Sequence, residues 1–256
     1  MSETKIRTEE LLGGAVLKVV LDAPKGNVLD GVMMASINAL LDGLRQKPDV
    51  KLLWFTGEGD HFSFGASVPD HVREKAPAML AAFHGMFLRL ADLAIPTAAT
   101  VRGRCLGGGM ELATYCHRVV AHPKALLGQP EIQLAVLPPV ASLVLPFRIG
   151  QAHADDLCLT GRTVPAPEAL AMGLVDEVAE DPDGALLAWA ERELLPKSAA
   201  ALRHGVRAAR WKFHQTLKTE LKLVEKMYLD ELMATHDANE GLAAFLEKRP
   251  PKYTNS

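Results

Sequence analysis

The sequence has little cysteine, with three residues among 256, at Cys105, Cys116 and Cys158, and no Cys-x-x-Cys pair. An odd, scattered set of this kind supports neither a disulfide framework nor a zinc site, so we expect reduced, mostly buried thiols. The nine histidines also lack the spacings that place two metal ligands on one helical face. His61 and His71 flank a Phe-Ser-Phe-Gly-Ala loop, where packing is the simpler role and proton relay the alternative. We therefore expect no resident metal.

Long apolar runs and an excess of positive charge are also missing. No run approaches the roughly 20 residues of a membrane span, and the N-terminal Met-Ser-Glu-Thr-Lys has no apolar signal region. With a net charge of −3, and basic residues dispersed except in residues 203–212, the chain has no general attraction for nucleic acid. We expect a soluble, cytoplasmic protein that binds neither membranes nor nucleic acid.

The hydrophobic content of 48% is enough for a large core. Residues 5–12 and 15–21 are β-rich runs around Gly13-Gly14, which predicts a hairpin with a two-residue turn. Strands at 51–56 and 97–101 alternate with helices at 30–45, with Asp30 as N-cap, and at 77–93. Repeated ββα-like units of this kind predict an α/β fold whose stacked sheets are wound as a spiral.

The second half of the chain becomes progressively helical. The pattern predicts a helix ending near residue 116, a strand at 118–121, helices at 143–149, 152–159 and 165–172, and a strand at 174–178. We divide the chain into a core at 1–184 and a helical C-terminal region at 185–256. An apolar stripe on a helix at 216–234 fits core packing and subunit association alike: Leu217, Leu221, Val224, Met227, Tyr228, Leu232 and Met233.

A glycine-rich turn is the most informative local feature. Gly107, Gly108 and Gly109 precede a helix, where bare N–H groups and the positive dipole end favour a developing anion. Glu111 follows in the first helical turn, and Glu131 comes from a separate Gly- and Pro-bounded segment. Two carboxyls beside such N–H groups suit acid–base chemistry at an enolate-like oxyanion. Taken alone, the same residues fit a tight turn followed by an acid that the dipole favours.

Six separate segments, in one order, resemble the crotonase (enoyl-CoA hydratase/isomerase) superfamily over nearly the full length. They are residues 24–29 (Pro-Lys-Gly-Asn-Val-Leu), 59–66 (Gly-Asp-His-Phe-Ser-Phe-Gly-Ala), 105–113 (Cys-Leu-Gly-Gly-Gly-Met-Glu-Leu-Ala), 128–132 (Gly-Gln-Pro-Glu-Ile), 159–163 with 169–175, and 240–249. The resemblance implies a crotonase-like spiral of ββα units, with the helical C-terminal region forming a homotrimer or a dimer of trimers.

The resemblance also implies an acyl-coenzyme A thioester as substrate, with no separate cofactor because coenzyme A belongs to the substrate. The N–H groups of Ala66 and Gly108 match the family's oxyanion hole, and Glu111 and Glu131 match the two hydratase glutamates that deprotonate water and return a proton to carbon. Retention of both acids favours hydration over isomerisation. Other implied substrate contacts are Lys25, Phe64, Ser67, Val68, Pro130 and Pro139.

Two departures narrow the expected substrate. Ser67 replaces the usual acid after Ala66, and residues 138–144 (Pro-Pro-Val-Ala-Ser-Leu-Val) replace a glycine-rich segment, so Pro139 lacks an N–H where the family has Gly. We therefore expect a more apolar acyl pocket. These segments resemble the cyclohexa-1,5-diene-1-carbonyl-CoA hydratases of anaerobic aromatic (benzoyl-CoA) degradation, which implies 1,4-addition of water to give 6-hydroxycyclohex-1-ene-1-carbonyl-CoA.

Two alternatives remain open. One is a general enoyl-CoA hydratase/isomerase of fatty-acid β-oxidation. The other is a non-catalytic crotonase-like scaffold or RNA-binding protein, for which the basic residues at 203–212 are the support.

Overall fold

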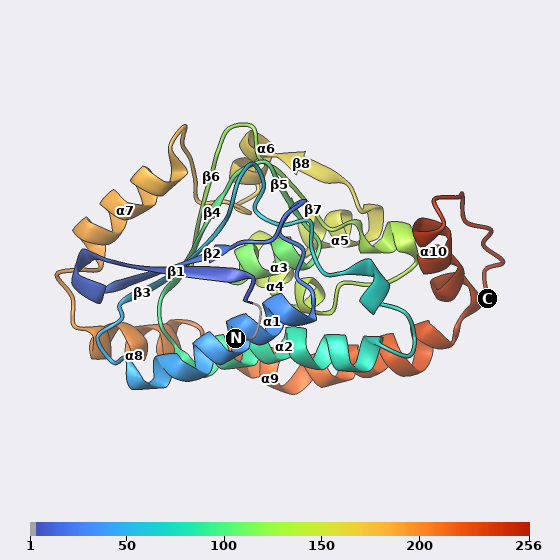
Figure 1. Ribbon diagram of the computed structural model, residues 1–256, viewed down its shortest axis with the longest axis horizontal. Helices are drawn as coiled ribbons and strands as arrows, with labels where there is room; N and C mark the ends of the chain where they lie inside the picture. The colour runs from blue at the N-terminus through green and yellow to red at the C-terminus, as the bar shows by residue number, and fades with distance from the viewer. Residues whose placement is uncertain (1–3) are drawn as a thin grey trace.

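The computed structural model describes residues 4–256 and contains two β-sheets of unequal size surrounded by helices (Figure 1). The larger sheet has the order β1-β2-β3-β4-β6-β9 and the smaller the order β5-β7-β8. The strands are β1 Ile6–Leu11, β2 Val16–Leu21, β3 Leu52–Gly57, β4 Thr97–Val101, β5 Arg104–Leu106, β6 Arg118–Ala121, β7 Leu126–Gly128, β8 Thr163–Pro165 and β9 Glu177–Val178. Neighbouring strands are parallel except for β1 with β2 and β7 with β8.

The chain passes repeatedly from one sheet to the other. Strand β4 of the larger sheet is followed directly by β5 of the smaller sheet, and β6 is followed by β7. Isolated parallel bridges pair Ser63 with Cys105 of β5 and Leu29 with Ala66. Through these bridges, the segments that follow β2 and β3 extend the layer formed by the smaller sheet. Each circuit thus contributes to both layers, which confirms the predicted spiral.

Helices cover both faces of the larger sheet. They are α1 Gly31–Gly43, α2 Ala76–Leu93, α3 Gly108–Tyr115, α4 Pro139–Ile149, α5 Gln151–Thr160, α6 Ala166–Ala171, α7 Pro182–Glu193, α8 Ala199–Ala209, α9 Trp211–Lys226 and α10 His236–Leu246. As predicted, Asp30 caps α1, since its carboxylate accepts a hydrogen bond from the N–H of Met33.

The period-two alternation of β3 divides the apolar interior into two clusters. Leu53 and Phe55 belong to the main core with α1 and α2, whereas Leu52 and Trp54 pack with residues of α7 such as Leu186. Figure 1 shows α7 on the opposite side of β2 and β3 from α1 and α2. Both faces of β3 are therefore buried, as is usual for a parallel sheet.

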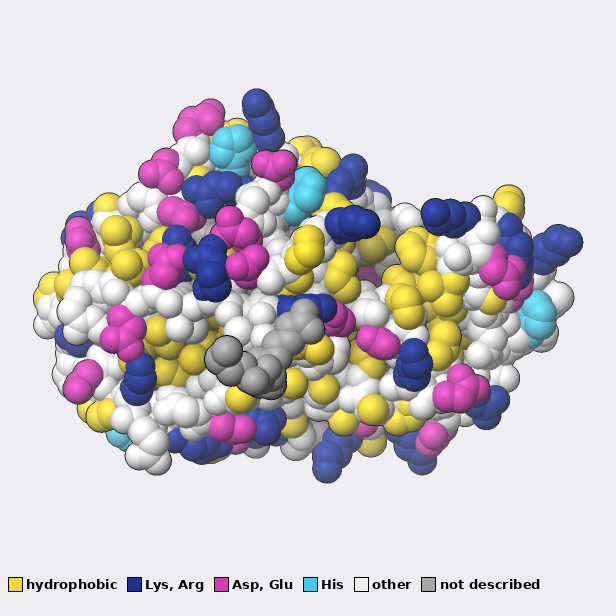
Figure 2. Space-filling view, viewed as in Figure 1, with side chains coloured by type: hydrophobic (Ala, Val, Ile, Leu, Met, Phe, Trp, Pro, Cys, Tyr) yellow, Lys and Arg dark blue, Asp and Glu magenta, His cyan; other side chains and the backbone are white. Residues whose placement is uncertain are grey.

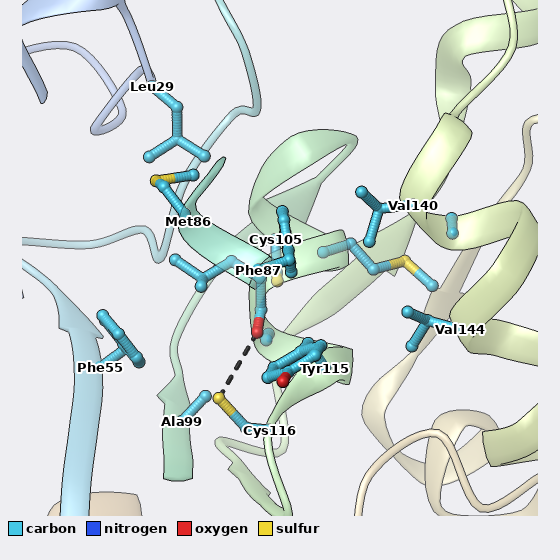
Figure 3. Close-up of a cluster of buried hydrophobic side chains, with 14 of the residues drawn as sticks. Leu29, Phe55, Met86, Phe87, Ala99, Cys105, Tyr115, Cys116, Val140 and Val144 are labelled. Carbon is cyan, nitrogen blue, oxygen red and sulfur yellow. Dashed lines mark hydrogen bonds between the residues drawn. The ribbon is translucent and has the colours of Figure 1, made fainter. Parts of the chain in front are cut away.

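Helix α3 lies in the middle of the main core, and all of its residues are buried. Figure 3 shows Tyr115 at its C-terminal end beside Phe87, with ring centroids 5.4 Å apart in an edge-to-face arrangement. The neighbouring Cys116 thiol donates to the carbonyl of Leu112 at 3.4 Å. Cys105 and Cys116 are free and buried, as predicted. A helix packed this deeply places its N-terminus, with the glycine turn, inside the protein.

Three predicted boundaries are wrong. The β1–β2 connection is a 3₁₀ turn, Leu12–Gly14, because Leu12 as well as the two glycines adopts positive φ. Helix α4 begins at Pro139 rather than residue 143, since proline suits the first helical position. The strand predicted at 174–178 contains only β9, because the N–H groups of Leu174 and Val175 close α6 by donating to the carbonyl of Ala169.

The predicted helix at 216–234 is interrupted. Helix α9 ends at Lys226 and is followed by a π-helical turn, Met227–Glu231, and a 3₁₀ turn, Leu232–Ala234. Leu217, Leu221, Tyr228 and Met233 of its apolar stripe are buried in the main core, whereas Met227 is 47% exposed. Core packing therefore accounts for these four residues, and subunit association stays a prediction.

The surface carries mixed charge. Figure 2 shows acidic and basic side chains interspersed over one face. Within residues 203–212, Arg203 donates to the carbonyl of Leu93 at 3.3 Å and Arg210 to that of Cys116 at 3.2 Å, so both side chains serve the fold. Among residues 4–256, no helix is long and apolar enough to cross a membrane, and no three His, Cys, Asp or Glu side chains converge as a metal site requires.

Candidate active site

The loop that carries Ala66 is held by two buried polar side chains. Nδ2 of Asn27 donates to three backbone carbonyls in residues 58–62, at 2.9 to 3.2 Å. The hydroxyl of Ser63 donates to the carbonyl of Asn27 at 2.8 Å and accepts from the N–H of Gly65 at 3.0 Å. These hydrogen bonds hold the segments at residues 24–29 and 59–66 against each other and fix the direction of the backbone at Ala66.

The N–H of Ala66 points away from its neighbouring chain. Leu29 donates its N–H to the carbonyl of Gly65 at 2.9 Å and accepts from the N–H of Ser67 at 3.3 Å. In a parallel bridge, the residue between two such bonds directs its own N–H to the other side. Within residues 4–256 that N–H donates to no protein group, and Ala66 lines a pocket on that side.

The first residue of α3, Gly108, lies next to Ala66. A Cβ atom placed on Gly108 would stand 3.2 Å from the backbone nitrogen of Ala66 and 3.1 Å from the ring of Phe83. The N–H of Gly108 has no intrahelical partner, as expected for a first turn. The preceding Gly107 has φ +51°, and a Cβ there would lie 2.6 Å from Oε1 of Glu131. The glycine turn therefore brings backbone N–H groups and a carboxyl together, which a tight turn alone does not require.

Glu111 lies in the first turn of α3 and is 3% exposed. Its Oε1 accepts a hydrogen bond of 2.7 Å from the N–H of Ala141. Burial raises the pKa of Glu111 to about 7, while hydrogen bonds from the N–H groups of Ala141 and Val140 oppose that rise. Glu111 therefore exchanges its proton near neutral pH.

Glu131 lies in a 3₁₀ turn, Pro130–Leu134, that follows β7. Its Oε1 accepts from the side-chain amide of Gln129 at 3.3 Å, and its buried Oε2 has no hydrogen-bond partner in the described chain. Burial raises its pKa well above the ordinary value, and the charge of Glu111 adds to the rise. The charge of Glu111 thus disfavours ionisation of Glu131, so the two carboxyls do not ionise independently.

These groups face one cavity of about 70 Å³. Eight of the predicted site residues line it: Phe64, Ala66, Val68, Gly108, Glu111, Pro130, Glu131 and Pro139. Most of the remaining wall is apolar, with Met79, Leu80, Phe83, Leu134, Val136 and Leu137 among its side chains. The cavity thus combines two carboxyls and two backbone donors with an apolar wall, as expected of a small-molecule site.

Two predicted contacts lie outside this cavity. Lys25 lines a separate hollow of about 390 Å³. Phe64 lies between the two spaces, since it lines the cavity and its ring would stand 2.5 Å from a Cβ on Gly26, a residue of the hollow. Ser67 lines neither space, and its carbonyl instead lies 2.9 Å from Nδ1 of His71.

Two polar side chains of the cavity wall are not among the predicted site residues, namely His71 and Tyr228. A carbonyl accepts only, so Nδ1 of His71 carries the hydrogen, and burial lowers the pKa of the imidazole. Tyr228 is 1% exposed. The sequence holds one signal for it, a tyrosine within the otherwise apolar stripe of the C-terminal helices.

The chain has clear similarity to known proteins. The sequence profile of a family described as enoyl-CoA hydratase/isomerase matches residues 12–256. Over 242 residues the chain is 43% identical to the cyclohexa-1,5-dienecarbonyl-CoA hydratase of Thauera aromatica, covering 94% of each chain. Over 241 residues it is 37% identical to a probable enoyl-CoA hydratase of Mycobacterium bovis, covering 93% of each. The crystal structure of an enoyl-CoA hydratase from Mycobacterium avium subsp. paratuberculosis K-10 shares the fold, with TM-score 0.85, 24% identity and coverage of 98% and 99% of the two chains.

Proposed function

Because the chain belongs to the enoyl-CoA hydratase/isomerase family, we propose that it is a hydro-lyase that adds water to a cyclic dienoyl-CoA thioester. The reaction is the conversion of cyclohexa-1,5-diene-1-carbonyl-CoA to 6-hydroxycyclohex-1-ene-1-carbonyl-CoA. The observation that carries the proposal is a pair of buried carboxyls with raised pKa values, Glu111 and Glu131, that lines one cavity with the backbone of Ala66 and Gly108.

The thioester oxygen binds between the N–H groups of Ala66 and Gly108. Negative charge develops on that oxygen as water adds to the conjugated system, and fixed donors stabilise the charge in the transition state. Removing one donor of this kind typically costs a few kcal/mol of activation free energy. Both donors are backbone groups, so the conformations of the loop at Ala66 and of the glycine turn determine the directions of the two N–H bonds.

The two glutamates divide the proton transfers. Glu111, with a pKa of about 7, is partly ionised at neutral pH and takes the proton of water as its oxygen bonds to the β-carbon. The electron pair of the double bond moves toward the thioester oxygen. Glu131, whose pKa is raised by burial and by the charge of Glu111, then supplies the proton that returns to carbon. In a conjugated cyclic diene that proton adds at the far carbon, which completes a 1,4-addition of water.

The apolar lining of the cavity supports the ring as acyl group. Leu137, Pro138 and Pro139 form one side of it, and Pro139 has no N–H to leave unpaired against a hydrocarbon ring. A flat, apolar ring suits such a wall. The 43% identity to the Thauera aromatica hydratase supports the same substrate.

The remainder of the ligand and the assembly follow from the same proposal. Coenzyme A runs from the cavity past Phe64 toward the hollow that contains Lys25. The protein acts in aromatic-compound degradation as a cytoplasmic homotrimer or dimer of trimers. Exposed aromatic residues are candidates for the subunit contacts, among them Phe147, 49% exposed, and Trp211, 66% exposed. A second candidate function is general enoyl-CoA hydration, which the similarity to the Mycobacterium bovis protein favours.

Turnover of an acyl-CoA panel tests the proposal. Turnover is followed spectrophotometrically, through loss of the conjugated double bond for crotonyl-CoA and cyclohex-1-ene-1-carbonyl-CoA and through conversion of the dienoyl to the enoyl chromophore for cyclohexa-1,5-diene-1-carbonyl-CoA. We expect the cyclic diene to give the highest kcat/KM. Faster turnover of crotonyl-CoA would leave a general enoyl-CoA hydratase, and turnover of none of the three would refute hydratase activity.

A further inference from the structure

Tyr228 has a buried hydroxyl that the proposed acid–base steps do not use. Its side chain is 1% exposed and lines the same cavity as the two glutamates. Its Oη has no hydrogen-bond partner within residues 4–256. Buried hydroxyls in folded proteins nearly always have a partner, so an unpartnered hydroxyl on a residue that lines a ligand cavity points to a ligand atom as its partner.

The backbone around Tyr228 is also unusual. The residue belongs to the π-helical turn Met227–Glu231, which separates α9 from the 3₁₀ turn Leu232–Ala234. Single π-helical turns are rare and frequently lie at functional sites. Position 228 continues the apolar stripe of Leu217 and Leu221, and an apolar side chain would fill the core there equally well. Packing therefore does not explain why this position carries a hydroxyl.

Glu131 supplies a second unpaired atom in the same cavity. Its Oε2 is buried and, like the hydroxyl of Tyr228, has no partner among the described residues. Burial raises the pKa of Tyr228, and the nearby charge of Glu131 adds to the rise, so the phenol stays protonated and able to donate. The two groups are close enough to interact electrostatically but do not hydrogen-bond to each other. A ligand oxygen within hydrogen-bonding distance of both atoms would satisfy both.

We propose that Tyr228 is a further catalytic residue whose hydroxyl hydrogen-bonds to the oxygen that is added to the acyl group, opposite Oε2 of Glu131. Before addition that oxygen belongs to the attacking water, and afterwards it is the hydroxyl of the product. Tyr228 donates one hydrogen bond to it and Oε2 of Glu131 accepts one from it, which leaves one lone pair of the water free to attack carbon. The site thereby recognises β-hydroxyacyl thioesters. This inference rests on the proposed hydration.

A matched pair of ligands tests the contact. The pair is 2-hydroxycyclohexane-1-carbonyl-CoA and cyclohexane-1-carbonyl-CoA, which differ by one hydroxyl, and binding is measured by calorimetry in a Glu111→Gln background that suppresses turnover. Adding Tyr228→Phe should weaken binding of the hydroxylated ligand about five- to tenfold, as for one neutral hydrogen bond, and change that of the other less than twofold. Tyr115→Phe is the control, because Tyr115 is also buried but its hydroxyl lies 3.4 Å from Nε2 of His214, outside the cavity.

The outcomes separate this inference from the proposed function. Equal changes for both ligands, or none, would overturn the role of Tyr228 even in a protein that hydrates the cyclic diene. Selective loss of the hydroxylated ligand supports the contact, and absence of turnover by the wild-type protein would then refute only the proposed hydration. With the unmodified Glu111, Tyr228→Phe should lower kcat about tenfold or more, with less effect on the KM of the diene, since the diene itself lacks the hydroxyl.

Discussion

Oε1 of Glu111 accepts a hydrogen bond of 2.7 Å from the N–H of Ala141, in the first turn of α4. The residue that precedes α4 is Pro138, which supplies no side-chain cap, so Glu111 satisfies an otherwise unpaired donor at this helix start. The positive end of the helix dipole favours the ionised carboxylate. For Oε1 of Glu131 the hydrogen-bond donor is instead the neutral amide of Gln129. The N–H groups of Ala141 and Val140 thus oppose the rise that burial causes in the pKa of Glu111, whereas the charge of Glu111 adds to the rise in the pKa of Glu131.

Removing the Ala141 N–H should shift the pH dependence of activity. Ala141→Pro deletes the donor in a first helical turn, where proline is tolerated, and so raises the pKa of Glu111 by about one to two units. The acid limb of kcat/KM, near pH 7 in the wild-type protein, should move to higher pH by that amount. Ala141→Gly keeps the N–H and should leave the limb in place. Coincident limbs in the two variants would contradict the assignment of Glu111 as base.

Replacing either carboxyl should impair the reaction more than binding. Glu111→Gln and Glu131→Gln each keep the shape of the side chain but remove a group that exchanges a proton, and turnover should fall roughly 10²-fold or more. The Kd for a saturated acyl-CoA should change much less. Near-normal turnover in either variant would show that the replaced glutamate is not a catalytic acid or base.

Glu111 should also make stability depend on pH. Its folded-state pKa of about 7 lies above the ordinary 4.5. Between these values the folded protein holds a proton that the unfolded chain has lost, so the free energy of unfolding falls as pH rises through this window, in total by on the order of 3 kcal/mol. Glu111→Gln removes this titration. The Tm of the variant minus that of the wild-type protein should therefore increase from pH 5 to pH 8, and a constant difference would argue against the raised pKa.

A methyl group on Gly108 should affect activity more than folding. In Gly108→Ala the added Cβ is 3.1 Å from the Phe83 ring and 3.2 Å from the nitrogen of Ala66, so one of them must shift by a few tenths of an ångström. The donors would then miss the thioester oxygen, and kcat should fall about tenfold or more. Gly31→Ala, at a helix start with nothing within 4 Å, is the control. If activity and cooperative melting are lost together in Gly108→Ala, the glycine is explained by the turn alone.

Pro139→Gly tests the wall of the acyl cavity. The substitution restores an N–H and some backbone freedom at the first residue of α4, beside the ring position. The ratio of kcat/KM for the cyclic diene to that for crotonyl-CoA should decrease severalfold, mostly through kcat, because the β-carbon of the ring is held less accurately against Glu111. An unchanged ratio would show that the proline does not select the ring.

Much of the fold was predictable because its signals are local. The apolar periodicity and the Asp30 cap predicted α1 to within a few residues, and alternation between short strands and helices predicted the spiral. The predictions failed where a tertiary contact or local backbone geometry outweighs periodicity. Val175, for example, leaves the expected strand because its N–H closes α6, and the helix expected to continue to residue 234 changes to a π-helical turn after Lys226.

The same division holds for the site. The order of the motifs was enough to predict Glu111, Glu131, Ala66 and Gly108, and the structure places all four at one cavity. The role of the Ala141 N–H could not be predicted from the sequence, because every non-proline residue carries an N–H group. Only the packing of α4 against α3 directs this one toward Glu111. Tyr228 was predicted only as part of an apolar stripe. The sequence by itself determined which chemical groups are present, whereas the tertiary structure decided which are desolvated and face one another, since pKa values and unpaired hydrogen-bonding atoms depend on neighbours distant in the chain.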